Sequence, residues 1–222
     1  MIQFIDYEKY YSKEKIVEAK DIKIKEQSIS FIMGPNGSGK TTLLKCLLDL
    51  EKYNGTILID GNRSSSELEN CLVIWDDCPF YSNNTGLENL FIFGEQKKCK
   101  NEILELSKKY LDMNLLKKKV KTYSYGQKKK LALILVDILQ PKYLFMDEIS
   151  NGLDYEMMQE LKRHLKELSQ KMTIILTGHQ FSFYDEVIDE LYLIKDKQLR
   201  KYDKYSDGNK SLEEVYNEEL YL

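Results

Sequence analysis

The stretch Gly34-Pro35-Asn36-Gly37-Ser38-Gly39-Lys40-Thr41-Thr42 decides how the rest of the chain can fold. It fits the phosphate-loop pattern G-x-x-x-x-G-K-[ST] at every fixed position. The apolar run Ser28–Met33 precedes it with the length of a strand, and Leu43–Leu50 follows it with apolar residues at helical spacing. The sequence therefore predicts a strand, a glycine-rich loop and a helix, which is the context in which such a loop binds phosphate.

The chemistry of this loop explains why these residue types are needed. Backbone N–H groups of a glycine-rich turn point toward phosphate oxygens, and the N-terminus of the following helix adds a positive field. We expect Lys40 to reach the β- and γ-phosphates of a nucleotide and the Thr41 hydroxyl to bind Mg²⁺. The predicted nucleotide-binding residues of the loop are Gly34, Pro35, Asn36, Gly37, Ser38, Gly39, Lys40, Thr41 and Thr42.

The composition is that of a soluble globular protein, with 222 residues that are 42% hydrophobic and 31% charged. The formal net charge of −3 and the scarcity of arginine disfavour a nucleic-acid partner. The four cysteines form no C-x-x-C pair, so we expect reduced thiols and neither a disulfide framework nor a zinc site. No signal-peptide core and no run of roughly 18 apolar residues occurs, so any membrane role is expected to come through a partner.

Apolar alternation and short apolar runs predict the strands of an α/β fold. These are Ile2–Tyr7, Ile16–Ala19, Ile22–Ile24, Ser28–Met33, Thr56–Asp60, Cys71–Trp75, Lys142–Met146, Met172–Thr177, and a hairpin of Glu190–Ile194 with Gln198–Tyr202. Apolar residues at helical spacing predict helices over Gly86–Glu95, Asn101–Leu111, Gly126–Leu139, Asp154–Lys171, Phe181–Glu186 and Ser211–Leu220.

The block from 85 to 140 has helical periodicity and no strand signal. We expect it to be a helical subdomain inserted into one domain, whose α/β core and β subdomain are formed by 1–84 and 141–222. Thr85 and Glu88 have the spacing of a capping box at its first helix. Lys128–Lys130 and His164 lie in charged stretches, and we expect their side chains to be exposed to solvent.

Two further predicted strands end in residues that suit phosphate chemistry. Lys142–Met146 runs into Asp147 and Glu148, and Met172–Thr177 runs into Gly178 and His179. Ligands of open α/β sheets bind at the carboxyl ends of the strands. We expect Asp147 to hold Mg²⁺, Glu148 to polarise the water that attacks the γ-phosphate, and His179 to face the phosphates.

One more stretch, Tyr123-Ser124-Tyr125-Gly126-Gln127, directly precedes an apolar helix and lies about 20 residues before Asp147. Together with the phosphate loop, the two acids and His179, it resembles the signature motif of the ATP-binding cassette (ABC) proteins, which is LSGGQ in its common form. Asn151-Gly152-Leu153-Asp154 resembles the D-loop of the same family. The resemblance covers essentially the whole chain.

The resemblance implies a RecA-like P-loop NTPase core sheet with an N-terminal antiparallel β subdomain and an inserted α-helical subdomain. It places Tyr11, with Tyr10 as the alternate, where the family has its adenine-stacking aromatic. Lys40, Glu148 and His179 are then the catalytic residues. Cassettes of this family sandwich two ATP molecules in a head-to-tail dimer. The nucleotide contacts outside the phosphate loop are expected from Tyr11, Ser124, Gly126, Gln127 and Asp154.

Two positions depart from the family pattern. A glutamine usually follows the strand Cys71–Trp75 and links Mg²⁺ to the surface that contacts the permease, whereas this chain has Asp76. Tyr125 replaces a glycine inside the signature. Neither change removes a primary catalytic group, and the residues expected to hold the metal are Thr41, Asp76 and Asp147.

The resemblance implies the ATP-hydrolysing subunit of a membrane ABC transporter, an exporter of the ABC-2-type, drug or bacteriocin self-protection branch. Its partners would be a separate integral-membrane permease and an identical or different second cassette, at the cytoplasmic face of the membrane. One alternative is a soluble cassette of translation or DNA repair, which would carry a long coiled coil or a second cassette. A P-loop kinase would need neither the signature nor the helical insert. A non-catalytic cassette would not need intact Lys40, Asp147, Glu148 and His179.

Overall fold

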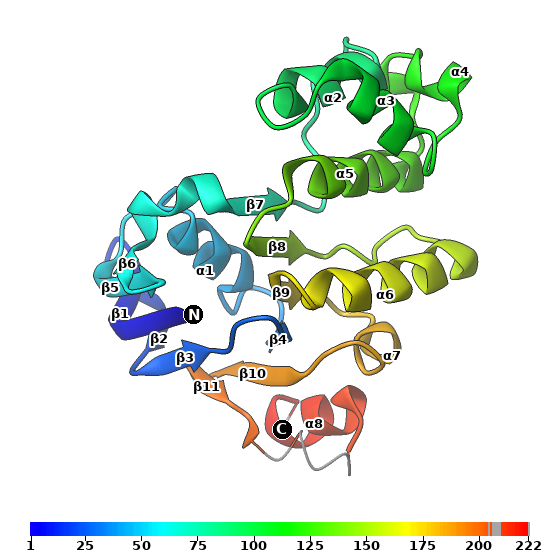
Figure 1. Ribbon diagram of the computed structural model, residues 1–222. Coiled ribbons are helices and arrows are strands. Elements are labelled where there is room, and N and C mark those ends of the chain that lie inside the picture. Colours follow the sequence, from blue (N-terminus) through cyan, green and yellow to red (C-terminus); the bar gives the residue numbers. More distant parts are fainter. Residues whose placement is uncertain (204, 206–209, 222) are drawn as a thin grey trace.

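The computed structural model describes residues 1–203, 205 and 210–221, and Figure 1 shows the arrangement of its elements. The strands are β1 (Ile2–Tyr11), β2 (Glu14–Ala19), β3 (Ile22–Ile24), β4 (Ile29–Met33), β5 (Asn54–Ile59), β6 (Asn62–Arg63), β7 (Cys71–Ile74), β8 (Tyr143–Asp147), β9 (Thr173–Thr177), β10 (Glu190–Lys195) and β11 (Gln198–Lys201). The helices are α1 (Lys40–Leu47), α2 (Gly86–Gly94), α3 (Lys100–Ser107), α4 (Met113–Leu116), α5 (Tyr125–Leu139), α6 (Tyr155–Ser169), α7 (Phe181–Tyr184) and α8 (Leu212–Glu219).

The strand that precedes the phosphate loop lies inside a parallel group. The spatial order of this group is β10-β4-β9-β8-β7, and each neighbouring pair is parallel. Every residue of β4, β8 and β9 is buried, because helices cover both faces of a parallel sheet. Asp147 is in register with Thr177, and Thr177 with Ile32, so the carboxyl ends of three adjacent strands form one edge.

The N-terminal strands form the antiparallel part of the same sheet. β1 pairs antiparallel with β2, β3 and β5, and β5 continues to β6. A hairpin of β10 with β11 joins this part to the parallel strands, since β11 pairs with β2 and β10 with β4. The predicted α/β class, with a P-loop core sheet and an N-terminal antiparallel part, is therefore confirmed.

Helix α5 belongs to two hydrophobic cores because two of its faces are apolar. Leu131, Ile134 and Ile138 pack with α2 and α3 in a core separate from the sheet. Ala132 and Val136 belong to the central core, together with buried residues of β8 and α6. Figure 1 shows the consequence: α2, α3 and α4 form a group at one end of the molecule, and α5 lies between that group and β8.

Local sequence signals correspond well to the observed elements. The Thr85 hydroxyl accepts from the Glu88 N–H at 3.1 Å, and the Glu88 carboxylate accepts from the Thr85 N–H at 2.6 Å, which confirms the predicted capping box. The short helix α4 was not predicted, because four residues carry too little periodicity. All four cysteines are free thiols. Within the described residues, no helix has the length and hydropathy to cross a bilayer.

Candidate functional site

The phosphate loop connects β4 to α1 with the backbone conformation that its glycines permit. Gly37 and Gly39 have φ values of 78° and 101°, in the left-handed region that a side chain disfavours. The Lys40 ammonium is folded across the loop and donates to the carbonyl oxygens of Gly34 at 2.7 Å and Pro35 at 3.2 Å. Burial lowers the pKa of Lys40, and the nearby carboxylates of Glu148 and Asp147 oppose that shift. The loop thus holds a desolvated cation where phosphates would lie.

Thr41 and Asp147, both predicted to hold Mg²⁺, are brought into direct contact. The Thr41 hydroxyl donates to Asp147 Oδ2 at 2.8 Å, and the Thr177 hydroxyl donates to Asp147 Oδ1. Asp147 is only 6% exposed, so these hydroxyls satisfy a buried carboxylate. A hydroxyl and a carboxylate at this separation form the oxygen pair that Mg²⁺ prefers, and the residues present therefore fit that cation.

Glu148 and His179 form the next pair along the same edge. His179 Nε2 lies 3.3 Å from Glu148 Oε1, whereas Glu148 Oε2 is buried and has no hydrogen-bond partner among the described residues. Burial raises the pKa of Glu148 above its ordinary value of 4.5, and burial lowers the pKa of His179 below 6.5. Glu148 also has a φ of 54°, a sparsely populated conformation for a residue with a side chain. The free oxygen is placed for a small polar molecule such as water.

Tyr11 ends β1 beside the first turn of α1. Its hydroxyl donates to Glu51 at 2.5 Å and lies 3.5 Å from the Thr42 hydroxyl. The Lys9 ammonium lies 4.6 Å from the centroid of the Tyr11 ring, yet the residue remains 45% exposed. One face of the ring is therefore occupied by a cation, and stacking on an adenine would use the other face.

The signature residues lie at the start of α5. The Ser124 hydroxyl accepts from the Gln127 N–H at 3.2 Å, and the Gln127 side chain accepts from the Ser124 N–H at 2.9 Å. Gly126 is buried where an added Cβ would come within 2.8 Å of Met157 Sδ. Asp154 caps α6 by accepting from the Met157 N–H at 2.9 Å. Among the described residues, the hydrogen bonds of Ser124, Gln127 and Asp154 run to their own helices and not to the phosphate loop.

Asp76 makes a set of contacts that the sequence did not predict. Its backbone carbonyl and its carboxylate both accept from the Tyr125 hydroxyl, the former at 2.6 Å. Lys129 Nζ and Asn151 Nδ2 each lie 3.5 Å from Asp76 Oδ1. The prediction that Lys128–Lys130 are solvent-exposed is wrong for Lys129, which is 1% exposed. The helical spacing of the apolar residues in α5 is the one signal that could have indicated that the Lys129 side chain faces inward.

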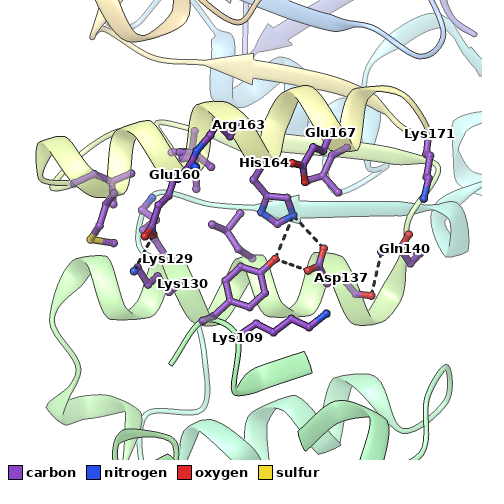
Figure 2. Close-up of a pocket in the computed structure, with 17 residues that line it drawn as sticks. Lys109, Lys129, Lys130, Asp137, Gln140, Glu160, Arg163, His164, Glu167 and Lys171 are labelled. Atoms are coloured by element: carbon purple, nitrogen blue, oxygen red, sulfur yellow. Dashed lines mark hydrogen bonds and ion pairs between the residues drawn. The ribbon is translucent and has the colours of Figure 1, made fainter. Parts of the chain in front are cut away.

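The prediction that His164 is merely exposed is also wrong. Its imidazole points from α6 toward α5 and lies 3.1 Å from Asp137 Oδ1, and the Tyr110 hydroxyl donates to Asp137 and lies 3.3 Å from His164 Nε2 (Figure 2). Burial alone would raise the pKa of Asp137, but the hydrogen bonds from His164 and Tyr110 hold it below 3.8. These groups border a cavity of about 540 Å³ between the two helices.

Comparisons with known proteins show what this chain is similar to. The family model described as ABC transporter matches residues 17–151. The lantibiotic transport ATP-binding protein SrtF of Streptococcus pyogenes is 30% identical over 99% of this chain and 97% of its own length. A solved ATP-binding subunit of an ABC transporter superposes with a TM-score of 0.86 at 22% identity, covering 98% of both chains. The cbiO1 protein of Clostridium perfringens, part of the transporter complex cbiONQ, superposes with a TM-score of 0.78 at 23% identity, covering 97% of this chain and 94% of that one.

Proposed function

Because the chain belongs to the ABC transporter family and is an ATP-binding, ATP-hydrolysing subunit of it, we propose that Lys40, Glu148 and His179 are its catalytic residues. The observation that carries this proposal is the meeting of these side chains with Thr41 and Asp147 at one edge of the parallel sheet. That edge combines a phosphate-binding loop, an oxygen pair for Mg²⁺ and a desolvated carboxylate.

The contacts of Lys40, Glu148 and His179 suggest a separate role in ATP hydrolysis for each of these residues. Lys40 exchanges the carbonyl oxygens of Gly34 and Pro35 for the β- and γ-phosphates of ATP. Glu148 Oε2 accepts the proton of a water whose oxygen attacks the γ-phosphorus as the bond to ADP breaks. His179 holds the other carboxylate oxygen and so fixes the direction of Oε2. Thr41 and Asp147, with Asp76 as a further proposed metal residue, would hold Mg²⁺, which would supply neutralisation of phosphate charge.

The signature is proposed to complete the site of a second cassette. The N-terminus of α5 presents the Ser124 hydroxyl and the N–H groups of its first turn, which suit an anion. Because Ser124, Gln127 and Asp154 contact their own helices and not the phosphate loop, we place them against the nucleotide of a partner in a head-to-tail dimer. The remaining proposed nucleotide contacts are Tyr11 with adenine and the residues of the phosphate loop.

The permease is proposed to dock on an apolar groove of about 290 Å³ beside Asp76. Residues of β7, of the segment that follows it, of α2 and of α5 line it: Leu72, Val73, Ile74, Trp75, Cys78, Pro79, Phe80, Phe93, Ala132, Leu135 and Leu139. At its margin Tyr81 stacks on Phe93 at 5.8 Å, and Tyr81 is 56% exposed. Exposed aromatic residues beside an apolar groove suit a helix of another subunit. The protein would then lie at the cytoplasmic face of the membrane.

The relatives support transport as the purpose of hydrolysis. SrtF is named for lantibiotic transport, and we propose by this likeness an exporter of the same branch. The soluble alternative in translation or DNA repair is not favoured by these relatives, and a kinase is not favoured by the family match. Which compound moves is a property of the permease.

The variant Glu148→Gln tests the proposal directly. An amide cannot take a proton from water, so we expect hydrolysis to fall by roughly 100-fold or more while ATP binding is kept. We also expect ATP to convert this variant into a stable dimer in size-exclusion chromatography. Glu160→Gln, at an exposed position of α6, is the matched control and should behave as the unsubstituted protein. Normal hydrolysis by Glu148→Gln would refute the assigned role.

A further inference from the structure

The two residues that depart from the family pattern contact each other. Asp76 follows β7, and Tyr125 is the first residue of α5, yet the Tyr125 hydroxyl donates to both the carbonyl oxygen and the carboxylate of Asp76. The Tyr125 ring packs against the backbone of Gly152, where an added Cβ would lie 2.6 Å from Tyr125 Cδ1. Tyr125 therefore joins the signature helix to two separate segments of the core.

A buried lysine stands beside this contact. Lys129 is one turn along α5 from Tyr125 and is 1% exposed. Its ammonium lies 5.0 Å from the centroid of the Tyr125 ring and 3.5 Å from Asp76 Oδ1. Burying a cation is costly unless nearby groups compensate it, and an aromatic face with a carboxylate supplies that compensation.

The same ammonium reaches the segment that carries the proposed catalytic base. Lys129 Nζ lies 3.5 Å from the backbone carbonyl oxygen of Glu148, and the Asn151 N–H donates to that oxygen at 3.1 Å. Asn151 Nδ2 in turn lies 3.5 Å from Asp76 Oδ1. Lys129 and Tyr125 thus contact the turn from Glu148 to Gly152 on one side, and the first residue of that turn has a positive φ of 54°.

We propose that Lys129 is a positioning residue for ATP hydrolysis: with Asp76 and Tyr125 it forms a latch that fixes the backbone of Glu148 and the start of the signature helix to the same point. This inference rests on the proposed function of Glu148 as the base. Because one latch holds both segments, a shift of α5 is transmitted to Glu148 within a single subunit. The direction of the base then depends on a buried residue that is not among the proposed nucleotide contacts.

Lys129→Met tests the latch, because methionine keeps the apolar stem and removes the cation. We expect kcat to fall by roughly 10- to 100-fold, the scale of a small displacement of a catalytic group, with the KM for ATP changed less than about twofold. Lys130→Met is the matched control, since Lys130 is the next residue of α5 and pairs with Glu160 on α6 at 3.0 Å. It should keep the kcat of the unsubstituted protein.

Tyr125→Phe is the second variant and keeps the ring while removing the bond to Asp76. We expect a smaller fall in kcat, and no further fall when it is combined with Lys129→Met, because both act through Asp76. Its control is Tyr192→Phe on β10, which removes a hydroxyl that donates to the Lys23 carbonyl at 2.8 Å and lies outside the proposed site. That control should leave kcat unchanged.

The outcomes separate this inference from the function on which it rests. Equal kcat for Lys129→Met and Lys130→Met overturns the latch, and so does a loss of ATP affinity and thermal stability in Lys129→Met with kcat unchanged. If Lys129→Met does not fold, an unchanged kcat in Tyr125→Phe overturns the latch and a reduced kcat supports it. Glu148→Gln is measured in parallel, because normal hydrolysis by that variant refutes the proposed function itself.

Discussion

The surroundings of the Glu148 carboxylate suit a general base, because the side chain is largely shielded from solvent. Burial raises its pKa, the Lys40 ammonium opposes that rise, and His179 fixes one of its oxygens at 3.3 Å. His179 itself has a pKa lowered by burial, so at neutral pH its imidazole is uncharged. A neutral histidine at this distance does not cancel the charge of the carboxylate, which suits the proposed role of Glu148 as a base.

Tyr11 yields the first prediction at this scale. Since Lys9 covers one face of its ring, adenine would stack on the opposite face, and Tyr11→Ala should weaken ATP binding by about 1–2 kcal/mol. Tyr10→Ala is the natural comparison, because Tyr10 neighbours Tyr11 and its ring lies 5.6 Å from Lys15. Fluorescent-nucleotide titration measures both affinities. An affinity lost in Tyr10→Ala and kept in Tyr11→Ala would move the adenine platform by one residue.

The sequence was most informative about residues in contiguous motifs. Lys40 and Thr41 were predicted from the loop, and Asp147 and Glu148 from the strand that ends at them. The contact of Asp76 with Tyr125 could not be predicted, because it depends on how two distant segments meet. Lys129 was predicted to be exposed since a run of three lysines usually is, but its position on α5 turns it toward the core.

Elements followed from periodicity where apolar residues were numerous. The buried strands β4, β8 and β9 and the helices α5 and α6 lie within a few residues of their predicted bounds. The capping box of Thr85 was visible in the sequence because its two members are three residues apart. Periodicity could not show the polar contact between α5 and α6. This contact joins Asp137 on α5 to His164 on α6, two residues that are far apart in the sequence.

That contact gives a prediction at the scale of elements. Tyr110→Phe removes the hydroxyl that donates to Asp137 and lies near His164, leaving a half-buried carboxylate with one partner fewer. We expect the free energy of unfolding to fall by about 1–3 kcal/mol, with little change in the KM for ATP. Tyr155→Phe, at a residue that is 73% exposed, is the control. Urea denaturation followed by circular dichroism makes the comparison, and equal stabilities of the two variants would contradict the structural role.

At the scale of the whole molecule, the strand order creates the site. The phosphate loop follows β4, whereas Glu148 and His179 follow β8 and β9, which occur more than a hundred residues later. Pairing of β4 with β9 and of β9 with β8 brings them to one edge. Local signals do not specify this order, and it was not predicted. The resemblance to the ABC family implied a RecA-like core sheet, and the superposition on a solved ATP-binding subunit of an ABC transporter and on cbiO1 confirms the fold.

In the proposed head-to-tail dimer, each ATP site combines the phosphate loop of one cassette with the signature of the other, which can be tested on a dimer of this chain. Ser124→Arg places a bulky cation at the signature, and Lys40→Ala removes the phosphate-binding cation of the loop. Each homodimer should therefore hydrolyse almost no ATP. A heterodimer of the two variants, purified through two different tags, has one site with both defects and one site with neither.

The measurement is the ATPase rate of that heterodimer beside a second heterodimer, in which an unsubstituted subunit is paired with one carrying both substitutions. If the signature acts on the partner's nucleotide, the first heterodimer recovers activity up to that of one working site. The second then has one defect in each site and stays inactive. Recovery in the second heterodimer with none in the first would contradict the account, because it would show that Ser124 acts on the nucleotide of its own subunit.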